Sequence, residues 1–419
     1  MNYKFTKGIR LLILYFLIML VYRFIIAENF NYLGFHIEGF SFNKLFFSSF
    51  FAIFLIGLSS FIKNEYYQLI YNICFVMLFI GQSIYYIYNS SNFILVIYMA
   101  VPLIFIFILD YFTNEKDRKF SNPKFSMKDS TTYYFFLFIT ILLTLPFFQN
   151  IGSINWRNLL FLDIYETRVA DDSDVDGILG YIFSPLSRVI LPFLFIYSIN
   201  NKKFLLTILT SINIIMIFLL NGALKSIIIG FIAAIFFYSG SYLKKNYRFI
   251  VSIILLHLMS IIEFAMLDSY NIADYLRRIF FTPASLFQVY LNYFDENFTY
   301  FTHSRFVSIF GSTNYETYIP IFIGEQVLGV KNLSANVGIF VEGFFSFGSI
   351  GVITVSLIFV LFILFLNKLD LKPEYFGIIF SYLYIINTSF IETLLLTHGL
   401  MFLFIFSIFF IPSSRQYNS

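Results

Sequence analysis

Apolar runs as long as a membrane-spanning helix recur along nearly the whole chain, and this feature limits the fold more than any other. Hydrophobic residues make up 59% of the 419 residues, and charged residues make up only 12%. A water-soluble globular chain carries about 25% charged residues, so this composition cannot cover a soluble surface. The solvent that suits such a chain is lipid.

Crossing a lipid bilayer takes about 20 apolar residues per helix, and only helices or a closed barrel satisfy the backbone there. The apolar runs here are continuous rather than alternating, which favours helices. We therefore predict an all-α polytopic membrane protein, a single integral membrane domain over 1–419 with about twelve transmembrane helices. The predicted spans are 9–27, 45–62, 67–88, 93–112, 132–150, 180–199, 204–220, 223–242, 249–267, 338–366, 374–391 and 397–412.

The basic residues predict the orientation. Loops that stay in the cytoplasm carry an excess of Lys and Arg. In this chain they gather at the N-terminus and in every second short connection, so we expect both termini in the cytoplasm. The residues concerned are Lys4, Lys7, Arg10, Lys63, Lys116, Arg118, Lys119, Lys124, Lys128, Lys202, Lys203, Lys244, Lys245, Arg248, Lys368, Lys372 and, near the C-terminus, Arg415.

Two connections on the external side are long. The first covers 151–179 and the second covers 268–337. The second is too long for a turn and too aromatic for a disordered linker. Within it, YLRRIFFTPASLFQVYLNYF has the apolar spacing of an amphipathic helix, which we expect on the outer membrane surface, with a helix restart at Pro283.

Arginines in these loops are candidates for binding a diphosphate. A guanidinium donates paired hydrogen bonds to phosphate oxygens and keeps its charge at any working pH. Each loop arginine taken singly fits a solvated or headgroup-facing charge equally well. The candidates are Arg157, Arg168, Arg277, Arg278 and Arg305.

Ionisable residues inside apolar spans are costly and therefore informative. Arg188 lies near the middle of the predicted span 180–199, where a polar cavity or an internal ion pair would accommodate it. Arg23, Lys225 and Glu263 lie near span ends, where long side chains reach the headgroups.

Few residues suit acid–base or metal chemistry. His303 is the only histidine of the second loop and is a candidate general base, although a lone histidine among aromatics also fits a structural role. Asp171, Asp172, Asp174 and Asp176 fit either a base or a solvated acidic loop. They lack EF-hand spacing, and no nucleotide-binding, zinc-protease or nucleophile-elbow motif occurs. With Cys74 as the only cysteine, we expect no disulfide and no metal site.

Three segments resemble the Wzy-type family of O-antigen and capsule oligosaccharide repeat-unit polymerases. The clearest is SANVGIFVEGFFSFGSIGVITVSLIFVLF, with Asn336 and then Phe347-Gly348-x-x-Gly351 leading into a long span. LRRIFFTPASLFQVYLNYFDENFTYF is similar to the long external loop of that family, and NGALKSIIIGFIAAIFF is similar to its small-residue-plus-basic span start.

This resemblance implies a membrane glycosyltransferase (GT-C-like) architecture in the bacterial cytoplasmic membrane. The implied reaction transfers a growing glycan from undecaprenyl diphosphate onto the non-reducing end of an incoming lipid-linked repeat unit. Arg188 and the five loop arginines would bind the substrate diphosphate and stabilise it as it leaves. His303, Asp171 or Glu342 would take the proton of the acceptor hydroxyl. The resemblance implies no cofactor and no nucleic acid partner, and it leaves open a Wzz-type chain-length regulator.

Three other functions stay open. A lipid-linked oligosaccharide flippase also has about twelve spans and uses intramembrane cations such as Arg188 and Lys225. An O-antigen ligase differs from a polymerase only in its acceptor. A membrane O-acyltransferase centres on an intramembrane histidine, and His257 lies within a predicted span without a supporting motif.

Overall fold

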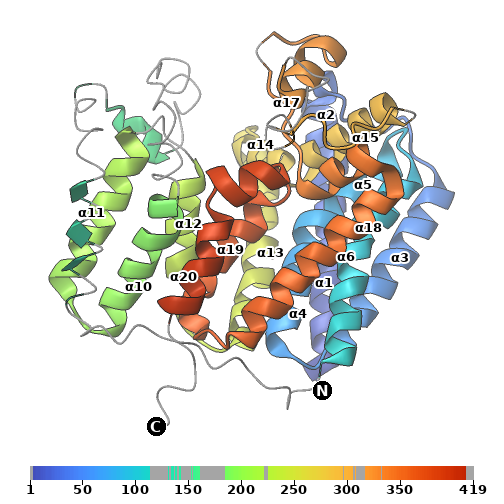
Figure 1. The fold of residues 1–419 in the computed structure, drawn as a ribbon. Coiled ribbons are helices and arrows are strands. Elements are labelled where there is room, and N and C mark those ends of the chain that lie inside the picture. Colours follow the sequence, from blue (N-terminus) through green and yellow to red (C-terminus); the bar gives the residue numbers. More distant parts are fainter. Residues whose placement is uncertain are drawn as a thin grey trace. The chain divides into compact units, whose positions relative to one another are not determined.

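The computed structural model describes residues 3–113, 185–220, 225–295, 297–304, 317–331 and 333–411, residue 307 and scattered residues between 131 and 160. Within these ranges the chain is helical and contains no strand (Figure 1). The prediction of an all-helical chain is therefore confirmed for the described part. Most of the predicted span 132–150 and of the predicted loop 151–179 lies outside it.

The structure forms two compact units, each made of segments that are separate in the chain. Unit 1 comprises Met1–Arg118, Ser241–Phe365 and Ile386–Ile391. Unit 2 comprises Lys119–Gly240, Leu366–Ile385 and Glu392–Ser419. The chain thus leaves unit 2 for only six residues at 386–391 before it returns.

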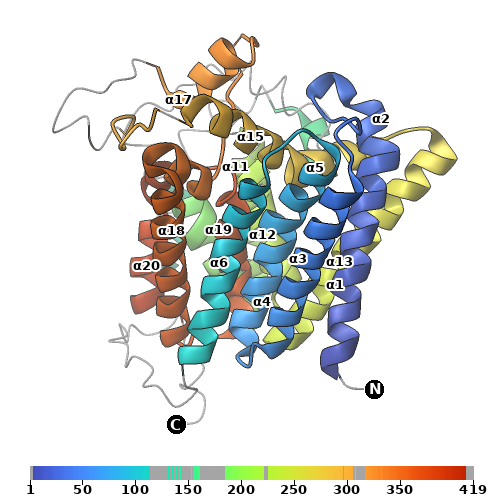
Figure 2. The same ribbon diagram turned by 90° about the vertical axis from the view of Figure 1, so that its right-hand side faces the viewer.

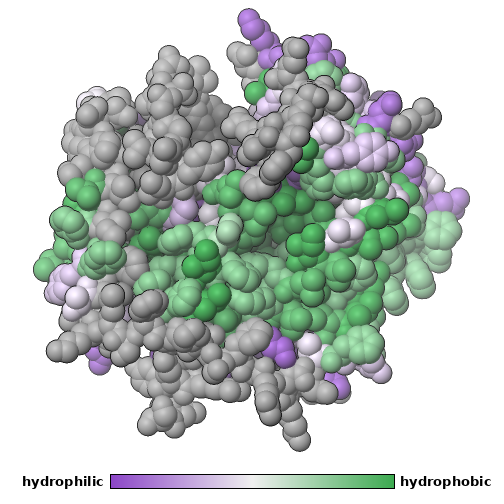
Figure 3. All heavy atoms as spheres, viewed as in Figure 1, coloured by the Kyte–Doolittle hydropathy of each residue, from purple (hydrophilic) through white to green (hydrophobic). Residues whose placement is uncertain are grey.

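Unit 1 contains the long apolar helices. Six helices in the described residues are long and apolar enough to cross a membrane, which supports a membrane protein. In Figure 2, α1, α3, α4 and α6 lie side by side, and Figure 3 shows apolar side chains covering the middle of the helices on its right-hand side. The six are Gly8–Asn29 (α1, Tyr3–Val21; η1, Tyr22–Ile26; α2, Ala27–Asn29), α3 (Phe42–Phe61), Glu65–Tyr88 (α4, Glu65–Cys74; η3, Phe75–Ile80; α5, Gly81–Tyr88), α6 (Phe93–Phe112), α13 (Tyr242–Leu267) and α18 (Ile339–Lys368).

Side-chain caps set several of these helix ends. The Asn64 side chain accepts the backbone N–H groups of Tyr66 and Tyr67 at the start of α4, and Asn92 accepts that of Ile94 at the start of α6. Asn and Asp are favoured at such positions because the first N–H groups of a helix have no partner within it. For α6 the predicted bounds 93–112 coincide with the observed ones.

The helix α18 is broken near its start, so the predicted span 338–366 is not one straight helix. Phe347 has a non-helical backbone, and Gly348 has a φ of +61°, which favours glycine. We call the helical segments before and after this break the first and second arms of α18. The arms meet at Gly343 and Gly351, where a Cβ at Gly351 would overlap the Gly343 carbonyl oxygen. The break leaves carbonyl groups without helical partners, and Thr299 N–H donates to the Phe345 oxygen at 2.9 Å. The Phe-Gly-x-x-Gly pattern therefore builds a sharp bend and a close contact between helical arms.

The predicted second loop holds short helices packed on unit 1. They are α14 (Asn271–Leu276), η7 (Arg277–Phe281), α15 (Thr282–Phe294), α17 (Ile319–Phe322) and η8 (Ile323–Val327). The apolar face of α15 is buried by protein, with Phe287 against Tyr98 and Phe344. The sequence suggested an amphipathic helix on the outer membrane surface, with its apolar face against lipid. In the structure, protein side chains cover that face instead. Tyr290 donates to the Ala335 oxygen at 3.0 Å, and burial raises the pKa of its hydroxyl.

We expected Glu263 to reach the lipid headgroups, but in the structure its side chain caps a helix. Its carboxylate accepts the Ile272 N–H at 2.8 Å and the Asn271 N–H at 3.1 Å, so it caps the start of α14. An acidic group at a helix start suits both the unpaired N–H groups and the helix dipole. Glu263 thereby fixes the turn that leads from α13 to the arginines of η7.

Unit 2 is built from shorter apolar helices. Among its described helices, α12 and α19 pack tightly against each other. A Cβ at Gly377 would overlap the Ala233 carbonyl oxygen there. The predicted span 374–391 ends early, since α19 stops at Ile385. The elements are η5 (Trp156–Leu160), η6 (Leu186–Ile190), α10 (Leu191–Asn200), α11 (Phe204–Leu220), α12 (Lys225–Phe236), η9 (Pro373–Tyr375), α19 (Phe376–Ile385), η10 (Thr393–Thr397) and α20 (Leu400–Phe409).

Candidate functional site

A buried arginine of unit 2 lies beside a histidine from a distant part of the chain. Arg188 belongs to the π-helical turn η6, and only 7% of its surface is exposed. Its Nη1 atom lies 2.6 Å from Nδ1 of His398, which directly follows the π-helical turn η10. Single π-helical turns often occur at functional sites. We call Arg188 and His398 the Arg188–His398 pair.

The chemistry of the two groups determines which atom holds the proton. A guanidinium has only donors and stays charged in proteins, so Arg188 donates and His398 Nδ1 accepts. His398 is therefore a neutral imidazole with its proton on Nε2, as inferred from this pairing. The pair combines a permanent positive charge with a basic nitrogen, within an apolar helical unit.

Backbone contacts hold His398 in place. Its N–H donates to the Thr393 oxygen at 2.7 Å, and its carbonyl oxygen accepts the Tyr382 hydroxyl at 2.8 Å. The next residue, Gly399, has a φ of +76°, and a Cβ there would lie 2.8 Å from Cγ of Pro185. Because Pro185 precedes η6, one close contact at Gly399 brings the two segments of the pair together.

In unit 1 the structure brings together two residues that the sequence offered as alternative bases. His303 Nε2 lies 3.2 Å from Glu342 Oε1, and His303 Nδ1 lies 3.0 Å from the Thr299 hydroxyl. The other carboxylate oxygen of Glu342 accepts the Ile391 N–H. Both side chains are at most 3% exposed. In this arrangement they join the loop, the first arm of α18 and the segment 386–391 to one another.

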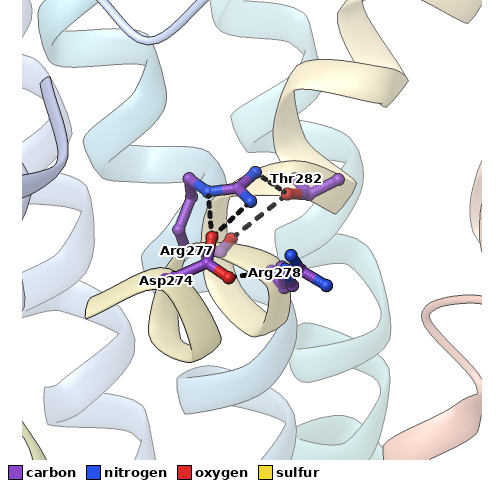
Figure 4. A network of polar contacts seen from close by, with 4 residues as sticks. All are labelled: Asp274, Arg277, Arg278 and Thr282. Atoms are coloured by element: carbon purple, nitrogen blue, oxygen red, sulfur yellow. Dashed lines mark hydrogen bonds and ion pairs between the residues drawn. The ribbon is translucent and has the colours of Figure 1, made fainter. Parts of the chain in front are cut away.

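The neighbouring arginines of η7 share the carboxylate of Asp274, as Figure 4 shows. Their side chains differ in exposure. Arg277 Nη2 lies 2.6 Å from Asp274 Oδ1, and the Arg277 guanidinium lies over the rings of Phe30 and Phe35. Arg278 Nε lies 2.9 Å from Asp274 Oδ2, and 37% of its side chain is exposed against 9% for Arg277. Arg277 is thus a packed structural cation, whereas Arg278 is accessible to a ligand.

The structure says less about the other site residues predicted from the sequence. Arg157 lies exposed on the 3-10 turn η5 of unit 2. Asp171, Arg168 and Arg305 lie outside the described residues.

Sequence reasoning did not select His398. It lies in the segment LLLTHGL at the start of the predicted span 397–412. A histidine followed by glycine at a span end is a weak signal by itself, but the combination with an intramembrane arginine would have justified testing it. The positive φ of Gly399 shows that the glycine ends the preceding turn.

The comparisons with known proteins do not identify a relative. The chain matches no protein-family model, no curated protein and no solved structure.

Proposed function

We propose that this protein is a membrane glycosyltransferase that polymerises lipid-linked oligosaccharide repeat units. It would move a growing glycan from undecaprenyl diphosphate onto the non-reducing end of an incoming lipid-linked repeat unit. The proposal includes about twelve spans, a GT-C-like architecture and a site that opens to the outer face of the bacterial cytoplasmic membrane. Its basis is the resemblance of the three segments described above, together with the chemistry of the buried charges.

The observation that carries the proposal is the Arg188–His398 pair. A charged side chain within an apolar helical unit is expensive and is retained mainly for function. Arg188 is buried in such a unit and contacts a neutral histidine. A lipid diphosphate is a ligand of matching chemistry, since its tails favour the bilayer and its oxygens accept from a guanidinium. We therefore assign Arg188 to the leaving diphosphate.

Arg278 is the second diphosphate candidate. Its side chain is 37% exposed, against 9% for the neighbouring Arg277. An exposed guanidinium can donate hydrogen bonds to diphosphate oxygens. The proposal needs no nucleotide, because the diphosphate already attached to the donor glycan is a good leaving group.

Deleting the gene and separating the surface polysaccharide on a gel tests the function in cells. Loss of long chains with retention of a single repeat supports a polymerase. Loss of every repeat instead indicates a flippase, and long chains left on the carrier lipid indicate a ligase. Either of these results would overturn the proposal.

Complementation with variants tests the site. Arg188→Ala is expected to leave single repeats, because the leaving diphosphate loses its buried cation. Arg23→Ala is the matched control, since Arg23 is an exposed arginine stacked on Phe24. Normal chain length from Arg188→Ala, at wild-type protein level, would remove Arg188 from the mechanism.

A further inference from the structure

We propose that three aromatic rings beside the break in α18 bind a sugar ring of the lipid-linked glycan. The rings are those of Tyr300, Phe301 and Phe347, and we call them the aromatic platform. All three residues belong to unit 1. The assignment rests on the proposed function, which supplies the lipid-linked glycan, and it names a place where that substrate is held by its sugar rather than by its diphosphate.

The backbone under the aromatic platform is strained. Tyr300 has a φ of +50° and Phe301 has a φ of +60°, so two consecutive aromatic residues adopt the left-handed conformation. Residues other than glycine avoid it, because the Cβ atom comes too close to the following carbonyl oxygen. Strained residues persist only where the surrounding structure imposes their conformation, and they cluster at binding and active sites. Two of them in succession therefore point to a functional turn.

Hydrogen bonds to the broken helix impose this conformation. Thr299 N–H donates to the Phe345 oxygen at 2.9 Å, and Tyr300 N–H donates to the Ser346 oxygen at 3.1 Å. Both acceptors lie at the end of the first arm of α18, just before the non-helical Phe347. The break in α18 thus supplies the carbonyl groups that fix the strained turn, and it places Phe347 beside that turn.

The strained turn brings both of its rings to one partner. The ring centroid of Phe347 lies 5.7 Å from that of Tyr300 and 5.4 Å from that of Phe301. Consecutive side chains of an extended strand point to opposite sides, so an extended backbone would separate the two rings. The platform is open to a ligand, since 63% of Tyr300 and 41% of Phe347 are exposed.

A sugar ring has the chemistry to bind these aromatic rings. The face of an aromatic ring carries partial negative charge, and the C–H groups on one face of a sugar ring carry partial positive charge. Contact between the two faces also removes apolar surface from water. The sugar hydroxyl groups stay at the rim, where the Tyr300 hydroxyl can donate to one and accept from another.

Lipid tails are the alternative ligand, and α3 shows how this chain exposes rings along an apolar helix. Phe46 and Phe50 lie one turn apart on α3, with stacked rings whose centroids are 6.4 Å apart. They are 67% and 65% exposed. A regular helix therefore presents rings to lipid without strain. The strained turn at Tyr300 favours a ligand that needs rings at fixed positions, as a sugar does, over tails that adapt to any apolar surface.

Binding measured without turnover tests the aromatic platform. The full chain in nanodiscs is titrated with lipid-linked repeat units extracted from the native cells and, separately, with undecaprenyl phosphate, which carries no sugar. We expect Tyr300→Leu to weaken binding of the repeat unit about tenfold, since leucine is apolar but has no aromatic face. Tyr300→Phe keeps the ring and should stay within about threefold of the wild type. Binding of undecaprenyl phosphate should not change in either variant.

Two further variants separate the platform from general effects on the fold. Phe50→Leu is the matched control, because it removes an exposed ring from a regular helix, and it should bind both lipids as the wild type does. Phe347→Leu leaves the strained turn of Tyr300 and Phe301 unaltered in sequence. It should weaken repeat-unit binding to a similar extent as Tyr300→Leu, and it decides the test if Tyr300→Leu lowers the thermal midpoint.

The outcomes distinguish the platform from the proposed function. Repeat-unit affinities of Tyr300→Leu and Phe347→Leu within about twofold of the wild type overturn the platform. Equal weakening for both lipids also overturns it, because the rings would then bind the tail. Neither result changes the proposed function, which the gene deletion tests by itself. If the repeat unit binds through Tyr300 but the deletion leaves polymer length normal, the platform stands and the polymerase fails. A wild type that does not bind the repeat unit overturns both.

Discussion

Two neighbouring arginines of this protein have different roles, and the difference follows from how deeply each side chain is buried. Arg277 and Arg278 are adjacent and both contact Asp274, but only Arg277 is enclosed by Phe30 and Phe35. The π-helical turn η7 places the two side chains differently although they are neighbours in the chain. Gly81 allows this turn to approach α5 closely, since a Cβ there would overlap the Phe280 carbonyl oxygen.

The two arginines should therefore respond differently to substitution. Arg277→Ala should lower the stability of the purified protein by about 1–3 kcal/mol, because it loses the Asp274 pair and two aromatic contacts. Arg278→Ala should change stability by less than about 1 kcal/mol but shorten the surface glycan. Thermal unfolding in detergent and gel profiling measure the two effects. An Arg278→Ala variant that unfolds as early as Arg277→Ala would contradict this division of roles.

Glu342 provides a second test at this scale. Glu342→Leu leaves the Ile391 N–H and His303 without their buried partner, and each lost partner costs about 1–3 kcal/mol. Glu342→Gln keeps an acceptor oxygen and should cost less. Thermal midpoints compared between the two variants measure this. Equal midpoints for Leu and Gln would mean that the carboxylate does not hold the segment 386–391.

At the scale of elements, close helix contacts depend on small residues rather than on apolar pattern. The bend in α18 requires the positive φ of Gly348 and the contact between Gly343 and Gly351. The hydropathy of this stretch is high enough for a membrane span, so the apolar pattern alone could not reveal the bend. The glycine spacing was visible in the sequence, but its consequence depends on which helix arm lies opposite.

Gly351→Ala is expected to destabilise the protein by about 1–3 kcal/mol, since the added methyl group overlaps the Gly343 carbonyl oxygen. The control is Gly57→Ala in α3, where nothing lies within 4 Å of the added Cβ. That substitution should be neutral or stabilising, because alanine favours helix more than glycine does. Thermal unfolding midpoints compare the two. A Gly351→Ala midpoint equal to that of Gly57→Ala would disprove the close contact.

At the scale of the whole molecule, membrane topology is the property on which the proposed function depends. The distribution of basic residues predicts that 268–337 is external and that the connection at 200–203 is cytoplasmic. Both segments contain exposed residues in the structure, Lys331 in the first and Asn201 in the second. The native Cys74 is buried and should stay unlabelled.

Cysteine labelling in whole cells measures this topology. A membrane-impermeant maleimide should label Lys331→Cys in intact cells and Asn201→Cys only after lysis. The reason is that the reagent reaches only the external face until the membrane is opened. Labelling of Asn201→Cys alone in intact cells would invert the protein and place the loop arginines on the wrong side for an external lipid-linked glycan.

The sequence by itself determined the solvent, the helical class and the bounds of helices such as α6, because hydropathy and Asn caps act over a few residues. The tertiary structure alone decided that Arg188 meets His398, 210 positions away, and that His303 meets Glu342. It also decided the division into two units. These outcomes depend on which helices pack together, and packing joins residues whose separation in the chain leaves no local signal.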